Sequence, residues 1–556
     1  MSTVWKRPQP NKPLSNPRGC ATTPYTTFDN SSTPKALEAL LKPPAIPGLT
    51  DSLTDLSPTD WRTTLARLRQ ARLLAGADPH QPGHLDAHPL VREYFGDQLR
   101  RQRAEAWREG NRRLYEHYRA LAPPLPENVR DMEPLFMAVV CGCRAGFYRD
   151  ALHEVYLPRI QRGNTSFAAN TLGARGALLS VLAYFFESDR WGSPVQAGVE
   201  GQRLNPEDQL LILMQAAVYL TATRGLAAPE ARICYERAEP LCQSLGRPLL
   251  LGAALIGQWR YSLHTDKLTA TLRIAERVHS LAQAQHDAGL LMEAYRALAA
   301  TLFSLGDFEA SRQYAMRAVQ IWRSGNVPSY TQDPYTPVVA CLCYLTLAEW
   351  HLGEIASGQA TIAEAISLAK GLNGLPALAI ALAWAAAFAQ CQRNPAEVDR
   401  LATELIELST RYHFAFWLPE GAIYRGWARS VSGDPAAGIL WIEQGIRDLR
   451  ATGTVLALPY FLGLRAEAFH LANRTSEALE AIKEAEEVVE RSEEREWCAE
   501  LHRLRGVLLA ATGADKAQIE AAFGEAIRTA KQQKSISLMK RAEASHAEYR
   551  GQKRKR

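Results

Sequence analysis

The chain has 556 residues, 47% of them apolar, which is ordinary for a folded protein and leaves room for several domains or one long solenoid. Its formal net charge of +5 is too small to require a polyanionic partner. Its nine cysteines have no framework spacing, which excludes a disulfide scaffold and favours a reducing, cytoplasmic setting.

Residues 1–34 form a leader rich in Pro, Ser, Thr and Asn, and this composition predicts disorder rather than a secretory signal. Residues 35–122 have a different sequence pattern from this leader. Ser57-Pro58-Thr59-Asp60 is a typical helix start, with serine as the cap and proline in the first turn. The segment 75–87 is too rich in Gly, Pro, Asp and His for a helix. Its position, between about 73 and 88, is compatible with the strand–loop–strand wing of a winged-helix domain.

A repeat of 40 residues dominates the rest of the chain, up to about residue 540. Its markers are Gly353, Arg393, Gly433, Asn473 and Gly513. Each lies at a predicted turn, where Gly and Asn tolerate a positive φ. Seven positions before each marker the residue is small, as at Thr346, Ala386, Gly426, Ala466 and Gly506. The flanking segments carry apolar residues at helical spacing. This pattern predicts an all-α solenoid of stacked helix hairpins over 123–540, with almost no strand after 125.

The offsets resemble those of tetratricopeptide repeats, although the usual period is about 34 residues. The most apolar run, 375–389, falls in phase as the first helix of one hairpin. It is also shorter than the ~20 residues that a bilayer requires, so we interpret it as a buried repeat helix. Residues 541–556 form a basic tail, which we interpret as a solvated end of the chain.

Solenoids present extended concave surfaces, lined in tetratricopeptide arrays by the first helix of each hairpin. Aromatic and arginine side chains on such a surface are suited to anchoring a protein or peptide. Counting from the small residues, the pattern places eight side chains on this side: Arg296, Trp350, His351, Trp427, Tyr460, Glu467, His470 and Arg503. Packing between repeats is the alternative for each of them.

Three segments resemble the winged-helix domain of signal-transduction ATPases with numerous domains, the NACHT and NB-ARC type. They are Ile46-Pro47-Gly48-Leu49-Thr50, the predicted helix around Trp61 to Leu74, and Asp86-Ala87-His88-Pro89-Leu90-Val91-Arg92-Glu93-Tyr94-Phe95. The stretch from Gly426-Trp427-Ala428 through Leu501-His502-Arg503-Leu504-Arg505-Gly506 is similar to the repeat array of bacterial predicted ATPases of this type. The resemblance implies that His88 faces the β-phosphate of a bound ADP. A helix-cap role before Pro89 is the alternative.

The chain departs from this family in one respect. It contains no G-x-x-x-x-G-K-[ST] loop and no Gly-Lys dipeptide, so it lacks the loop that would hold the phosphates. It looks like the sensor half alone, and a separate NTPase domain would be a partner. We therefore expect no enzymatic activity and no cofactor.

Other catalytic or metal motifs are also absent, including H-E-x-x-H, G-x-S-x-G and paired C-x-x-C. His80, His84 and His88 are four apart, near Asp78 and Asp86, but the prolines among them prevent the helix that would align them. No metal site is predicted.

The sequence thus favours a non-catalytic helical-repeat sensor or scaffold that binds a protein or peptide. The alternative is a DNA-binding transcriptional regulator that uses the winged helix. From Thr59 to Arg119 there are 12 Arg and no Lys against 8 Asp and Glu, a net of +4 with the two signs interspersed. A DNA-reading surface usually concentrates positive charge, so nucleic acid is not the expected partner.

Overall fold

The structure is a computed structural model that describes residues 34–555, except for 54, 78–83, 188–189, 326–336, 373, 413 and 415. The predicted leader lies outside the described residues apart from residue 34. The described part is helical and contains no strand; its backbone forms an isolated bridge between Phe186 and Pro194. The predicted all-α solenoid, with no sheet after residue 125, is confirmed for this part. No helix in it is long and apolar enough to span a bilayer.

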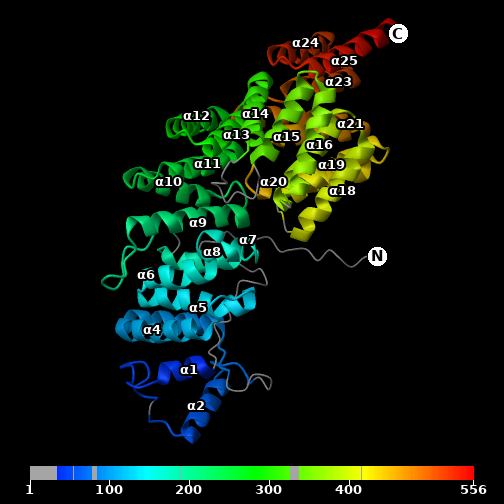
Figure 1. Cartoon of the computed structure of the whole chain (residues 1–556). Helices are drawn as coiled ribbons and strands as arrows, with labels where there is room; N and C mark the ends of the chain where they lie inside the picture. Colours follow the sequence, from blue (N-terminus) through cyan, green and yellow to red (C-terminus); the bar gives the residue numbers. More distant parts are fainter. Residues whose placement is uncertain are drawn as a thin grey trace. The chain divides into compact units, whose positions relative to one another are not determined.

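The chain divides into two compact units, residues 1–223 and 224–556. The first unit contains α1 (Pro34–Leu41), α2 (Pro58–Gln70), α3 (Pro89–Gln102), α4 (Ala104–Leu121), α5 (Val129–Ala145), α6 (Tyr148–Asp150), η1 (Ala151–Gln161), η2 (Gly163–Thr165), α7 (Phe167–Asn170), α8 (Arg175–Leu182), η3 (Ala183–Phe185) and α9 (Pro206–Arg224). Helix α4 packs along α5 (Figure 1). Ser57 caps α2 by accepting a hydrogen bond from the Asp60 N–H, as its sequence predicts.

The winged-helix prediction for residues 35–122 is not confirmed. Where the wing is expected, the described backbone contributes a hydrogen bond from Ala75 N–H to the Asp86 carbonyl, 2.7 Å, rather than paired strands. Residues 78–83, at the centre of the predicted wing, lie outside the described part. Neither α2 nor α3 contains a buried residue. The buried residues described in this region include Ala39, Ile46 and Tyr115, on or near α1 and α4.

The second unit is a stack of helix hairpins (Figure 1). Its helices are α10 (Pro229–Ser244), α11 (Pro248–Thr265), α12 (Leu268–Gln285), α13 (Ala288–Ser304), α14 (Phe308–Arg323), α15 (Pro337–His351), α16 (Ile355–Gly371), α17 (Leu375–Cys391), α18 (Pro395–Tyr412), α19 (Trp417–Val431), α20 (Pro435–Ala451), α21 (Leu458–Leu471), α22 (Thr475–Ser492), α23 (Cys498–Ala511), α24 (Lys516–Gln532) and α25 (Ile536–Lys555). The predicted basic tail is part of α25.

The turns within the hairpins lie where the 40-residue markers predict. All five marker residues have positive φ, from 60° at Arg393 and Asn473 to 105° at Gly433. Each follows the C-terminal end of the first helix of a pair, where a left-handed residue satisfies the last carbonyls. The small residues let paired helices approach closely. A Cβ built on Gly426 of α19 would lie 2.6 Å from the Gly438 carbonyl oxygen of α20.

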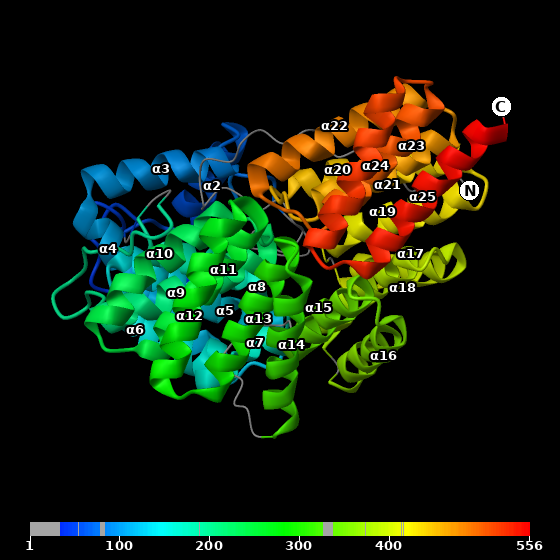
Figure 2. The ribbon, with the colours of Figure 1, turned by 90° about the horizontal axis from the view of Figure 1, so that it is seen from above.

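The stack also closes on itself, because hairpins that are five apart in sequence touch. The Val455 N–H, before α21, donates to the His264 carbonyl at the end of α11, 2.8 Å. One repeat later, the Arg495 N–H donates to the Ser304 carbonyl of α13, 2.7 Å. Helix α25 continues the series beside α23 and α24 (Figure 2). The loops that precede α21, α23 and α25 therefore cover the ends of α11, α13 and α15.

Candidate functional site

The structure places the eight predicted groove residues on first helices, as expected, but most are covered by the chain itself. Arg296, Trp350, His351, Trp427 and Tyr460 are buried, and Trp427 has no exposed surface. The other three, Glu467, His470 and Arg503, are partly buried. A binding role for these eight residues stays a prediction, and a partner would have to displace intramolecular contacts to reach the buried ones.

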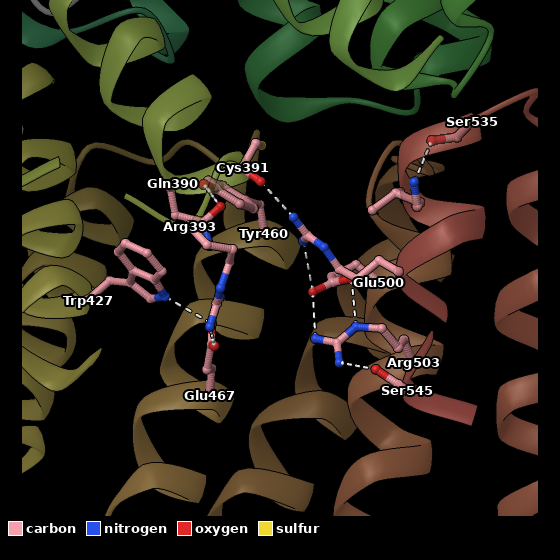
Figure 3. Close-up of polar contacts among 12 residues, drawn as sticks. Gln390, Cys391, Arg393, Trp427, Tyr460, Glu467, Glu500, Arg503, Ser535 and Ser545 are labelled. Carbon is pink, nitrogen blue, oxygen red and sulfur yellow. Dashed lines mark hydrogen bonds and ion pairs between the residues drawn. The ribbon is translucent and has the colours of Figure 1, made fainter. Parts of the chain in front are cut away.

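Trp427 and Glu467 form one polar cluster between neighbouring first helices (Figure 3). The Trp427 Nε1–H donates to Glu467 Oε2, 2.8 Å, and Arg393 pairs with the same carboxylate, 2.9 Å. The Arg393 guanidinium also lies 5.1 Å from the centre of the Trp427 ring. Because Glu467 stands 40 residues after Trp427, this cluster joins the same level of adjacent repeats.

A second cluster joins α23 to α25 around Glu500 (Figure 3). Arg503 donates twice to this carboxylate, at 2.8 and 2.9 Å, and Arg541 donates to it at 3.2 Å. Burial would raise the pKa of Glu500, but the two guanidiniums hold it well below its usual range. Arg541 also donates to the Cys391 carbonyl, 2.7 Å, so the cluster fixes α25 against the end of α17.

His351 and Tyr460 also make contacts within the chain. His351 Nδ1 lies 2.8 Å from Ser535 Oγ, and its ring stacks on Phe308 with centroids 3.6 Å apart. Burial lowers the pKa of His351 well below its usual value, so the ring is neutral. The Tyr460 hydroxyl donates to Gln390 Oε1, 3.0 Å (Figure 3). These contacts explain why both side chains are buried without a partner protein.

His88 caps α3. Its Nδ1 accepts a hydrogen bond from the Leu90 N–H, 3.3 Å, and the side chain is exposed. The capping role is therefore present in the structure, and the nucleotide-sensing role stays a prediction. His80 and Asp78 of the histidine-rich segment lie outside the described residues. Elsewhere in the described part no group of three potential ligands is arranged to hold a metal ion.

A feature that the sequence analysis missed is a cavity of about 130 Å³ inside the second unit. Six first helices, from α11 to α21, contribute to its wall. Ten aromatic side chains line it: Trp259, Phe303, Tyr344, Trp384, Phe416, Trp417, Tyr424, Tyr460, Phe461 and Trp497. Tyr344, Trp384 and Tyr424 are 40 residues apart and stand nine positions before successive markers. The repeat therefore contains the signal for this cavity.

Two buried carboxyl groups, Glu420 and Glu496, also line the cavity. Burial raises the pKa of Glu420 to about 8, and no other cause acts on it. Burial likewise raises the pKa of Glu496 to about 8, against the opposing effect of hydrogen bonds from Ser304 and Trp497. At neutral pH both carboxyl groups are mostly protonated, so they add little negative charge to the cavity.

No family model matches the chain. It is 24% identical over 349 residues to an uncharacterized protein of Rhizobium meliloti, a match that covers 61% of this chain. The chain spans about a third of that relative, 33% of its length.

Three solved structures show a partial likeness to this chain, at low sequence identity. A Rap protein complexed with competence and sporulation factor is 10% identical with a TM-score of 0.42, covering 63% of this chain and 100% of its own. Aspartyl phosphate phosphatase F of Bacillus subtilis is 12% identical with a TM-score of 0.42, covering 71% and 93%. A signal-transduction ATPase with a tetratricopeptide repeat sensor from Pyrococcus horikoshii is 14% identical with a TM-score of 0.36, covering 86% and 63%. Likenesses at this level assign no function to the chain.

Proposed function

We propose that this chain is a non-catalytic, cytoplasmic helical-repeat scaffold that works as the sensor part of a signal-transduction NTPase. The observation that carries the proposal is the apolar face of α3. Leu90 and Tyr94 are 68% and 63% exposed, and Phe95 beside them is 51% exposed. Positions 90 and 94 are one helical turn apart and share a face. Clustered large apolar side chains of this kind mark interaction sites.

The partner proposed for this face is a nucleotide-binding domain. The family that residues 86–95 resemble has such a domain, and this chain has no phosphate-binding loop of its own. The Rhizobium relative is about three times longer than the part that this chain spans, which leaves room for further domains there. His88 begins the same helix as Leu90 and Tyr94, so a domain docked on α3 would lie next to it.

A site-specific photo-crosslinker at position 90 tests this docking surface. Leu440 on α20 is a matched control, because it is also a leucine that is 68% exposed on a helix. We expect position 90, and not position 440, to crosslink in cells to a protein that contains a G-x-x-x-x-G-K-[ST] loop. Leu90→Asp should abolish co-purification with that protein, whereas Leu440→Asp should not. Equal crosslinking at both positions, or none at position 90, would remove the proposal.

Nucleotide binding supplies the second test. The isolated chain should neither bind ATP tightly nor hydrolyse it. One hydrogen bond from His88 contributes about 0.5–1.5 kcal/mol, while micromolar affinity needs about 8 kcal/mol. In a complex with the NTPase domain, His88→Ala should speed ADP release, measured with a fluorescent ADP analogue. Unchanged release would refute the sensor role, and tight ATP binding by the isolated chain would refute the assignment as a whole.

The DNA-binding alternative gains no support from the structure. Several arginines of α3 and α4 already form ion pairs within their own region: Arg92 with Asp86, Arg100 with Asp97, and Arg112 with Glu109. These pairs neutralise part of the positive charge that contacts to a phosphate backbone would require. Nanomolar, sequence-dependent binding of a duplex at physiological salt would reverse this preference.

A further inference from the structure

The cavity of the second unit has a feature that packing does not require, namely the carboxyl group of Glu420. The side chain is 8% exposed, and the described residues give it neither a hydrogen bond nor an ion pair. Leaving a buried carboxyl unpaired costs stability. Such a residue is therefore expected where it serves a purpose other than folding.

The position of Glu420 in the repeat is a second argument that this residue has a purpose other than folding. Residues 340, 380, 420 and 460 are 40 apart, and all four line the cavity. The other three are Ala340, Ile380 and Tyr460. The fifth repeat places Glu500 at the same position, where Arg503 and Arg541 pair with its carboxylate. Glu420 differs from Glu500 in having no such partner among the described residues. Residues that break a local rule without a compensating structural gain are candidates for function.

Ten aromatic side chains line the same cavity as this carboxyl group. Tyr344 and Trp384 meet edge to face with centroids 4.4 Å apart, and Phe416 and Trp417 do so at 4.8 Å. The faces of such rings attract cations, and aromatic cages recognise quaternary ammonium groups. Rings and a carboxyl group together favour a positively charged organic ligand.

No side chain in the cavity already supplies that positive charge to Glu420. Arg296 is held by Glu293, 2.7 Å, and lies over the Trp259 ring at 4.8 Å. The other titratable groups on the wall are Arg260 and His264 from α11, Tyr344 from α15, Tyr424 from α19, Tyr460 from α21 and Glu496 before α23. Burial alone raises the pKa of Glu420, and neither Arg260 nor Arg296 contributes to that shift.

We propose that this cavity binds a small organic cation of the quaternary or tertiary ammonium class, with Glu420 as its counter-ion and the aromatic rings as its cage. The volume of about 130 Å³ sets the size of the ligand. A cavity of about 150 Å³ accommodates benzene, so a trimethylammonium group fits and a folded peptide does not. The site is separate from the docking surface on α3, and neither proposal depends on the other.

The ionisation of Glu420 gives the site a pH signature. Its pKa is about 8 in the unliganded protein, and the cation binds the carboxylate form. Below pH 8 binding must therefore release a proton. The apparent affinity for a permanently charged ligand should rise about tenfold per pH unit between pH 6 and 7, and level off above pH 8. An uncharged ligand should show no such dependence.

Choline and its uncharged carbon isostere, dimethylbutanol, are a matched pair of probes. Their binding to the full chain can be measured by calorimetry and by the fluorescence of the cavity tryptophans, such as Trp384 and Trp417. We expect saturable choline binding at pH 8.5 that is at least tenfold tighter than that of dimethylbutanol. Equal affinity for the two probes, or no binding of choline, would overturn the proposal.

Glu420→Gln removes the charge and keeps the shape of the side chain. It should weaken choline binding at least tenfold and leave dimethylbutanol binding unchanged. Glu407→Gln, at an exposed position of the neighbouring helix α18, is the control and should change neither. Unaltered choline binding by a folded Glu420→Gln variant would refute the counter-ion role. If that variant does not fold, the wild-type pH profile decides, since a flat profile for choline is incompatible with Glu420 as the counter-ion.

Discussion

The contact between α19 and α20 allows a quantitative prediction for Gly426→Ala. A Cβ at this position would lie 2.6 Å from the Gly438 carbonyl oxygen and 2.9 Å from the Ile442 backbone nitrogen. Both are main-chain atoms, so no side-chain rotation can relieve the overlap and the two helices must separate. Gly524 of α24 is the matched control, because a Cβ there meets nothing within 4 Å.

The two substitutions should have opposite effects. Alanine is favoured over glycine in a helix by ~1 kcal/mol, so Gly524→Ala should stabilise the protein by about that amount. Overpacking a core typically costs 1–3 kcal/mol, about 3 where neighbours cannot move. Gly426→Ala gains the helix preference of about 1 kcal/mol and loses about 3 kcal/mol to overpacking. We therefore expect its free energy of unfolding to fall by about 2 kcal/mol.

Urea unfolding followed by far-ultraviolet circular dichroism measures the difference. The comparison should use transition midpoints, since a repeat protein of this size need not unfold in two states. Gly426→Ala should lower the midpoint and Gly524→Ala should raise it slightly. If Gly426→Ala also raises the midpoint, the two helices are not in the close contact described above.

Three further predictions concern the interior of the second unit. Trp427→Ala should destabilise the fold by about 3–5 kcal/mol, as for a buried tryptophan, and a variant with wild-type thermal stability would instead favour the groove role. Arg541→Ala removes contacts to Glu500 and the Cys391 carbonyl, so limited proteolysis should release the C-terminal helix sooner than in the wild type. The pKa of Glu420 is raised from 4.5 to about 8, so its contribution to stability is full below pH 4.5 and is lost as pH rises through 8. Glu420→Gln should therefore raise the unfolding midpoint relative to wild type at pH 9 more than at pH 5, and an equal effect at both would contradict the buried carboxyl.

The local organisation of the second unit could be predicted from sequence because it depends on short-range constraints. The markers have the positive φ that Gly and Asn tolerate, and Gly426 is small because a backbone passes next to it. The wing prediction rested on composition alone, and the described residues around it form no strands. Composition can exclude a helix for a segment, but it cannot show that the segment forms a strand, because strand pairing depends on the neighbouring segments.

The burial of the predicted groove could not be read from the period. The repeat fixes how one hairpin packs on the next, but the curvature depends on a small rotation per repeat that accumulates along the stack. Trp427 and Tyr460 are buried by contacts with other repeats, Trp427 by Arg393 and Glu467 and Tyr460 by Gln390. The sequence places carboxyl groups at the same repeat position in Glu420 and Glu500. It could not show that Glu500 is paired with Arg503 and Arg541 whereas Glu420 has no partner among the described residues.

The closure of the stack changes how the protein should fold. In most solenoids each repeat touches only its neighbours, so stability is a sum of local terms and folding can begin anywhere. Here Thr454 and His264 are bonded across 190 residues, His351 and Ser535 across 184, and Lys534 and Glu309 across 225. Contacts this distant in sequence require loop closure before they stabilise anything, which slows folding. They also make the first and last hairpins depend on each other. During synthesis, α11 therefore leaves the ribosome long before the segment that contacts it in the folded protein, which lies 190 residues further along the chain.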